Sequence, residues 1–189
     1  MIYQSIQQQL KGSVGMRMDQ LIDRNVEIIK TLPHSIADKV VNHVREESLK
    51  GRRAADLIDE IKKLFPDKTR ADAALIARTE TSKASTALTR ARAEDIGLNW
   101  YVWRTSEDSR VRPAHDHMED VLINWNDPPS PEKLNNEKHI GYYHAGEIWN
   151  CRCYPEPLVS MDLIKWPHKV YSHGAISYMT REQFEKLSA

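Results

Sequence analysis

The sequence has little cysteine, little glycine, no long hydrophobic run and no excess of either charge. Lys and Arg number 27, and Asp and Glu also number 27, so the formal net charge is zero. This balance excludes nucleic-acid binding through a polybasic coat, and any such contact has to be local. No apolar run approaches the roughly 20 residues that span a bilayer. We therefore expect neither a membrane-spanning protein nor a membrane partner.

The two cysteines, Cys151 and Cys153, lie in one C-x-C. A pair of cysteines cannot make a disulfide framework, and a bridge between these two would close a strained, very small ring, so we expect reduced thiols. The N-terminal residues lack the basic region and the apolar region of a signal peptide, which predicts a chain that stays in a cytoplasm.

The first 98 residues have helical periodicity. Apolar stripes recur over 33–49, 57–65 and 73–91, and Pro66 ends the second. Asp67 or Thr69 is expected to cap the third helix, and Gly97 to end it. The stripe within 1–32 is interrupted by glycines, which favours an arm that becomes ordered on a partner. We expect its apolar face to be the contact surface.

The second half is rich in aromatic residues and proline, and its period changes. Residues 99–105 and 121–125 are predicted strands, 127–143 a loop, and 142–143 and 148–154 further short strands before Pro155 and Pro157 end the pattern. The fold class is therefore α+β: three to four N-terminal helices packed on a small, mostly antiparallel sheet. The expected parts are an arm at 1–32, a helical part at 33–98, a β part at 99–160 and a C-terminal tail at 161–189.

The C-x-C predicts a metal site. On an extended segment Cys151 and Cys153 point to the same side, and two thiolates favour zinc over magnesium or calcium. His115 is the leading third ligand, and the fourth comes from His117, Asp108 or His144. Four protein ligands would make this a structural zinc. The competing interpretation is that the cysteines are small core residues and the histidines surface groups.

Two arginines one strand period apart, Arg110 and Arg112, suggest either a phosphate-binding pair or internal ion pairs with carboxylates such as Glu80 and Asp108. Ion pairing is the simpler interpretation, because two carboxylates and two arginines in one core satisfy each other without any ligand. A catalytic site could be built from a candidate acid, a candidate base and phosphate-binding groups, namely Asp108, Arg110, Arg112, His115 and Glu80. No complete catalytic signature is present, which favours a protein that is not an enzyme.

Three segments in fixed order carry a family resemblance. They are Ile76–Thr81 with Ala-Arg-Thr-Glu, Trp103–His115 with D-x-R-x-R-x-x-H, and Asn150–Cys153 with Asn-Cys-Arg-Cys. Together, over about residues 35–159, they resemble the phage Mu F-like minor head proteins, the head morphogenesis family of tailed phages and prophages.

The resemblance implies a minor capsid protein inside the procapsid and the virion. It implies association with the portal protein and the capsid interior, contact with packaged DNA, and help in head assembly or genome delivery, with the host cytoplasm as the place of assembly. Domains of this family also occur fused to toxins, so a metal-dependent nuclease or toxin-like enzyme is the first alternative. A stand-alone DNA-binding protein is the second.

Overall fold

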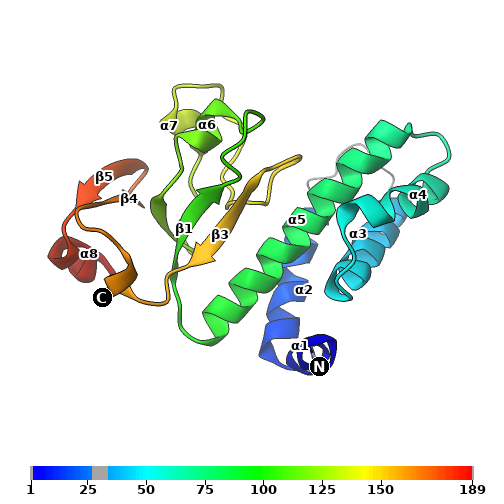
Figure 1. The fold of residues 1–189 in the computed structure, drawn as a ribbon, viewed down its shortest axis with the longest axis horizontal. Helices are drawn as coiled ribbons and strands as arrows, with labels where there is room; N and C mark the ends of the chain where they lie inside the picture. The colour runs from blue at the N-terminus through cyan, green and yellow to red at the C-terminus, as the bar shows by residue number, and fades with distance from the viewer. Residues whose placement is uncertain (1, 27–33, 189) are drawn as a thin grey trace. The chain divides into compact units, whose positions relative to one another are not determined.

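The computed structural model describes residues 2–26 and 34–188 and divides into two compact units. The first unit is Met1–Asp95 with Gly146–Cys151, and the second is Ile96–Ala145 with Arg152–Ala189. Helices precede a five-stranded mixed sheet (Figure 1), so the predicted α+β class is confirmed.

The first unit is helical. In its described part the helices are α1 (Ile2–Gln9), α2 (Ser13–Val26), α3 (His34–Leu49), α4 (Ala54–Leu64) and α5 (Arg70–Asp95). The long helix α5 packs against α2, α3 and α4, and Figure 1 shows these helices around it. The helical pattern of the first half is therefore confirmed where the structure describes it.

Residues at both ends of α5 explain its length. Thr69 Oγ1 accepts a hydrogen bond from the Asp72 N–H at 3.1 Å, and the Asp72 carboxylate accepts the Thr69 N–H at 3.0 Å. This reciprocal arrangement is a capping box, which satisfies backbone donors at the helix start. After the helix ends, Gly97 has φ +76°, a conformation that suits glycine. The predicted cap at Thr69 and stop at Gly97 are confirmed.

The apolar stripe of α2 is buried within the first unit. Val14, Met18, Leu21 and Ile22 form a cluster with alanines of α5. The expectation that this stripe is a free contact surface for a partner is therefore wrong, because the small side chains of α5 let α2 pack closely on them. Pro33, the side chain of Ala37 and the predicted boundary at 32/33 lie outside the described residues.

The second unit contains the sheet. Its strands are β1 (Trp100–Thr105), β2 (Val121–Asn124), β3 (Cys153–Pro157), β4 (His168–Ser172) and β5 (Ala175–Met179). Their order is β3-β1-β2-β4-β5. The β2–β4 pair is parallel and the other three pairs are antiparallel. The first two predicted strands are confirmed.

Three parts of the second half differ from the sequence-based expectation. Residues 142–143 are not a strand, and the strand predicted over 148–154 begins only at Cys153. β3 includes Pro155 and Pro157, because it lies at the edge of the sheet, where proline is tolerated. The tail 161–189 contains β4, β5, a short 3₁₀ helix (Met161–Leu163) and the helix α8 (Arg181–Ser188).

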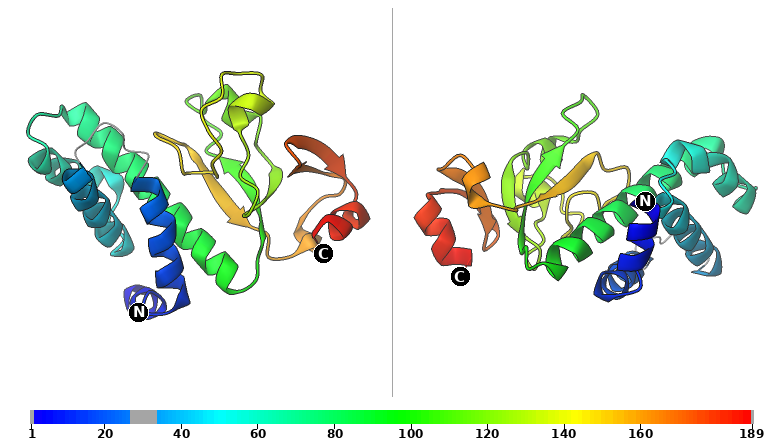
Figure 2. Two further views of the ribbon diagram at one scale, coloured as in Figure 1. Left: turned by 180° about the vertical axis from the view of Figure 1, so that it is seen from behind. Right: turned by 60° about the horizontal axis from the view of Figure 1, so that its bottom comes forward.

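Both faces of the central strand β1 are covered, and β1 is buried along most of its length. Trp100 and Val102 share a core cluster with Phe184 of α8. The alternate residues Tyr101 and Trp103 contact the rings of histidines and a tyrosine that come from α6 (Pro113–Asp116) and from the loop after α7 (Pro131–Leu134). Figure 2 shows α8 beside the β4–β5 hairpin. The second covered face carries the candidate site.

Candidate functional site

His115 lies at the centre of a buried row of hydrogen-bonded polar side chains in the second unit. Its Nε2 is 3.0 Å from the Tyr143 hydroxyl, and its Nδ1 is 3.4 Å from Cys153 Sγ. The Tyr143 hydroxyl donates in turn to Glu132 Oε1 at 2.5 Å. All four residues are more than 90% buried. A cysteine, a histidine, a tyrosine and a carboxylate are therefore connected below the surface.

The structure brings three of the predicted metal ligands together. One ligand atom each from His115, Cys151 and Cys153 lies within 4.8 Å of the others. Neither Cys151 nor Cys153 is in a disulfide bond. A group of one imidazole and two thiols can bind a metal ion, and its donor set matches zinc.

The predicted fourth ligands do not join this group in the part of the chain that the structure describes. His117 is exposed, because it follows His115 on a helical turn, where residues i and i+2 point in different directions. His144 Nδ1 lies 3.1 Å from the Tyr101 hydroxyl. Asp108 is bound to Arg152. Three side chains leave one of the four tetrahedral positions of zinc for a further ligand.

Asp108 and Arg152 join two of the sequence motifs within the second unit. Arg152 Nε donates to Asp108 Oδ1 at 2.9 Å, and its Nη2 donates to Oδ2. The backbone N–H of Arg110 donates to Asp108 as well, at 2.9 Å. The Arg152 hydrogen bonds, assisted by that N–H, lower the pKa of Asp108 to about 2. Asp108 is thereby held as an anion.

Asn150 joins two motifs within the first unit. Its backbone N–H donates to Thr79 Oγ1 at 2.9 Å, and its side-chain oxygen accepts from Arg78 Nε at 3.3 Å. Asn150 has φ +50°, in the left-handed region where asparagine is among the better tolerated residues. The Asn-Cys-Arg-Cys segment therefore begins by hydrogen-bonding to the Ala-Arg-Thr-Glu turn of α5.

Glu80 is buried and forms an ion pair within its own helix. Lys83 Nζ lies 2.9 Å from Glu80 Oε1, and the two side chains are 5% and 6% exposed. Burial raises the pKa of Glu80, and the nearby Lys83 ammonium opposes part of that shift. The predicted pairing with Arg110 or Arg112 stays a prediction. Arg110 is 73% exposed at its side chain and lies 3.5 Å from Asp108.

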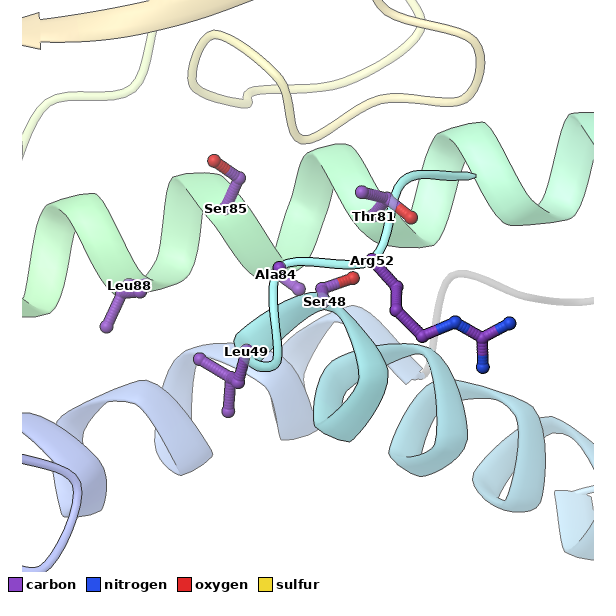
Figure 3. A pocket seen from close by; sticks show the side chains of 8 residues that line it. Ser48, Leu49, Arg52, Thr81, Ala84, Ser85 and Leu88 are labelled. Carbon is purple, nitrogen blue, oxygen red and sulfur yellow. The ribbon is translucent and has the colours of Figure 1, made fainter. Parts of the chain in front are cut away.

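A separate pocket of about 220 Å³ lies in the first unit, and Figure 3 shows it between α5 and the end of α3. Its lining includes Ser48 and Thr81, whose buried hydroxyl oxygens have no hydrogen-bond partner in the structure. The Arg52 guanidinium binds Glu47 and Glu60, and Figure 3 shows it directed away from Ala84. The predicted site residues do not line this pocket.

The comparisons with known proteins agree with the family resemblance that the three sequence motifs carry. Residues 38–155 match the family described as Phage Mu protein F like protein, and the chain belongs to this family. Membership suggests a phage head morphogenesis protein. The chain is also 32% identical over 147 residues to an uncharacterized protein of Haemophilus influenzae. That match covers 78% of this chain but only 30% of the relative. No solved structure matches the chain.

Several residues that hold the motif residues were not predicted from the sequence. The sequence suggested Asp108 as a zinc ligand or a catalytic group, and nothing local pointed to Arg152, which is 44 residues away. Lys83 is three residues from Glu80, which is a recognisable helical pairing distance. Glu132 lies in the short helix α7 and Tyr143 in the loop after it, within a stretch that the sequence predicted as one loop, so no pattern signalled their approach to His115.

No helix in the described ranges 2–26 and 34–188 has both the length and the apolar composition required to cross a membrane.

Proposed function

We propose that this chain is part of a minor head protein that acts in head morphogenesis at the portal vertex. It would bind the portal protein and the inner surface of the capsid in the host cytoplasm, and remain in the capsid interior of the virion. The family match over residues 38–155 carries this proposal. Because the chain spans 30% of its Haemophilus relative, the activities of a longer protein could lie in further segments.

The bonds among the motif residues support a structural role. Asp108 is held by Arg152, and Asn150 by Arg78 and Thr79. A carboxylate whose pKa is about 2 is a poor general base near neutral pH, where catalysis favours a pKa close to the working pH. His115 is 1% exposed. These residues are therefore better suited to hold the fold than to carry out nuclease chemistry.

Head assembly in the presence of the chain tests the proposal. Capsid, scaffold and portal proteins of the parent phage are co-expressed with the tagged chain, and purified heads are analysed by quantitative mass spectrometry. The expected result is a few copies per head, which disappear when the portal gene is omitted. Incorporation at the same level without the portal protein would contradict a position at the portal vertex. Metal-stimulated nuclease activity that His115→Ala abolishes would instead favour the enzyme.

Contact with packaged DNA, with assistance in genome delivery, is the second part of the proposal. Arg110 offers an exposed guanidinium whose contact with Asp108 is long, at 3.5 Å, whereas Arg181 of α8 is bound to Asp162 and Glu185. A phosphate contact should therefore be lost in Arg110→Gln and kept in Arg181→Gln. Fluorescence anisotropy with a short duplex should show weak binding that falls steeply with salt. Equal binding by both variants would remove Arg110 from the interface.

The metal part of the proposal is a zinc ion bound by His115, Cys151 and Cys153. Support comes from the proximity of their ligand atoms, within 4.8 Å, and from the N, S, S donor set. Protein purified without chelators should contain about one zinc per chain by elemental analysis. Cys153→Ser should reduce that content strongly. Zinc-free protein with freely titratable thiols would refute the site.

A further inference from the structure

Tyr143 and Glu132 lie behind the imidazole of His115, on the side opposite the thiol of Cys153. Nε2 of His115 is 3.0 Å from the Tyr143 hydroxyl, and that hydroxyl is 2.5 Å from Glu132 Oε1. Glu132 is 2% exposed and Tyr143 is 7% exposed. Neither residue belongs to the group of candidate ligands. Their position resembles the outer hydrogen-bonding shell that commonly supports a metal-binding histidine.

The hydrogen bonds from His115 through Tyr143 to Glu132 define the tautomer of the imidazole. A tyrosine hydroxyl has one proton, and here it donates that proton to the Glu132 carboxylate. Its oxygen then accepts from His115, so Nε2 carries the ring proton. In this tautomer, Nδ1 presents its lone pair towards Cys153 Sγ. This is the nitrogen that a metal ion shared with the thiolate would require.

Neighbouring residues hold these three hydrogen-bonded side chains in place. The ring of Trp103 packs edge-on against that of His115, with centroids 5.7 Å apart. The Tyr143 N–H donates to the Pro129 carbonyl at 3.0 Å, which ties the end of this loop to the residues just before α7 and therefore close to Glu132. The tyrosine and the carboxylate are thus held beside the imidazole by backbone as well as side-chain contacts.

Glu132 is a buried carboxylate with few polar contacts. Its Oε2 is buried and has no hydrogen-bond partner among the described residues, and the hydrogen bond from Tyr143 to Oε1 supports a side chain that is almost fully removed from water. Such burial is costly unless opposite charge lies near. Glu132 Oε1 is 4.0 Å from His115 Nε2. A divalent ion on Nδ1 would polarise the imidazole and increase the positive charge on its Nε2–H group, which faces the Tyr143 hydroxyl and lies near the Glu132 carboxylate.

We propose that Tyr143 and Glu132 are positioning residues for the metal centre, which orient His115 with Nδ1 towards the two thiolates and raise the affinity for zinc. This inference rests on the zinc site proposed above. It adds that the donor set of one imidazole and two thiolates is preorganised by a Glu–Tyr pair that makes no bond to the metal.

Conservative variants test the inference. Tyr143→Phe removes one hydroxyl, and Glu132→Gln removes the charge while keeping the shape. Matched controls are Tyr142→Phe and Glu137→Gln, at exposed residues of the same region. Zinc affinity is measured on the whole chain by competition with a chromophoric chelator. We expect the first two variants to bind zinc about 10- to 100-fold more weakly, and the controls to bind it as the unaltered chain does.

Two further measurements separate positioning from general stability. Co²⁺ in place of zinc should give a thiolate-to-metal absorption band in all four variants, because both thiolates remain, with an altered ligand-field spectrum only in Tyr143→Phe and Glu132→Gln. The melting temperature of the metal-free protein should fall in Tyr143→Phe but not in Tyr142→Phe, because only the first change removes the hydroxyl that hydrogen-bonds to the buried Glu132, so zinc affinity is the deciding measurement. If only the melting temperature changes and zinc affinity does not, the two residues are structural and the inference is wrong.

The outcome also distinguishes the inference from the zinc proposal on which it rests. If the unaltered chain binds zinc tightly and both site variants bind it equally well, the zinc site stands and the positioning role is refuted. If the unaltered chain binds neither zinc nor Co²⁺, the zinc site itself is refuted. Should Glu132→Gln fail to fold, Tyr143→Phe alone decides, because it removes only the hydroxyl oxygen that joins the histidine to the carboxylate.

Discussion

Replacing Glu80 by Gln should destabilise the helical unit, because it leaves the buried Lys83 ammonium without its carboxylate. The two charged atoms lie 2.9 Å apart. At an effective dielectric constant of about 20, their attraction is about 6 kcal/mol. Desolvation of both ions offsets much of that, so the intact pair contributes little net stability. Loss of one partner costs about 3–5 kcal/mol, a large part of the ~5–15 kcal/mol that stabilises a typical domain.

A double-mutant cycle measures this pair. The variants are Glu80→Gln, Lys83→Met and the double change, with urea unfolding followed by circular dichroism at 222 nm. Each single change should lower the free energy of unfolding by about 3 kcal/mol, and the double change by clearly less than the sum, because no unpaired charge remains buried. Asp59→Asn is the control, since the Asp59–Arg70 pair is 67–68% exposed and should change stability by less than about 1 kcal/mol.

The pH dependence provides a second measurement on the same residue. Burial raises the pKa of Glu80 in the folded protein, so the folded state binds this proton more tightly than the unfolded chain does. The contribution of Glu80 to stability therefore falls as the pH rises above the ordinary carboxyl pKa and through the folded value. Glu80→Gln should remove that fall. If Glu80→Gln unfolds at the same urea concentration as the unaltered protein at every pH, the account of a buried ion pair is refuted.

Two further predictions concern one residue in each unit. Because the Arg152 hydrogen bonds lower the pKa of Asp108 to about 2, the stability that Asp108 contributes should be present above its ordinary pKa of 3.8 and lost as the pH falls towards 2. Asp108→Asn should remove this fall in the free energy of unfolding, measured with urea at each pH. If the free energy of unfolding of the variant falls with pH as steeply as that of the unaltered protein, the salt bridge is contradicted. Gly15→Ala should lower the melting temperature markedly, because a Cβ there would overlap the Leu10 carbonyl, whereas at Gly12 the nearest atom is 3.7 Å away. Equal melting temperatures for Gly15→Ala and Gly12→Ala would show that the α1–α2 turn relaxes without cost.

Local sequence signals predicted the helices and the central strands well. The Thr69–Asp72 capping box and Gly97 lie within a few residues of the ends they define, so propensity and pattern were enough. The strand at β1 was also recoverable, because Trp100 and Tyr101 begin an alternation that fits burial on both faces. Such signals depend only on neighbouring residues.

The interactions that form the site are not local, and this is why the sequence predicted only part of it. Cys153 and His115 are 38 residues apart, and Tyr143 comes from a loop with no periodic pattern. Their types suggested a metal site, but the hydrogen-bonded Glu132 could not be inferred from spacing. His117 does not join His115 because the two histidines lie on a helical turn, where residues i and i+2 point in different directions.

The two prolines of β3 have a consequence for how copies of the protein meet at high concentration. Leu158 N–H donates to the Trp100 carbonyl, and Ser106 N–H to the Arg152 carbonyl. The alternation of an antiparallel ladder then directs the backbone of Tyr154 and Glu156 towards β1, and that of Pro155 and Pro157 outwards. Proline has no N–H, so this border of the sheet offers no amide donor at either position to a strand from another molecule. Copies of the chain are therefore not expected to join along β3 into a continuous, aggregating sheet, even at high concentration.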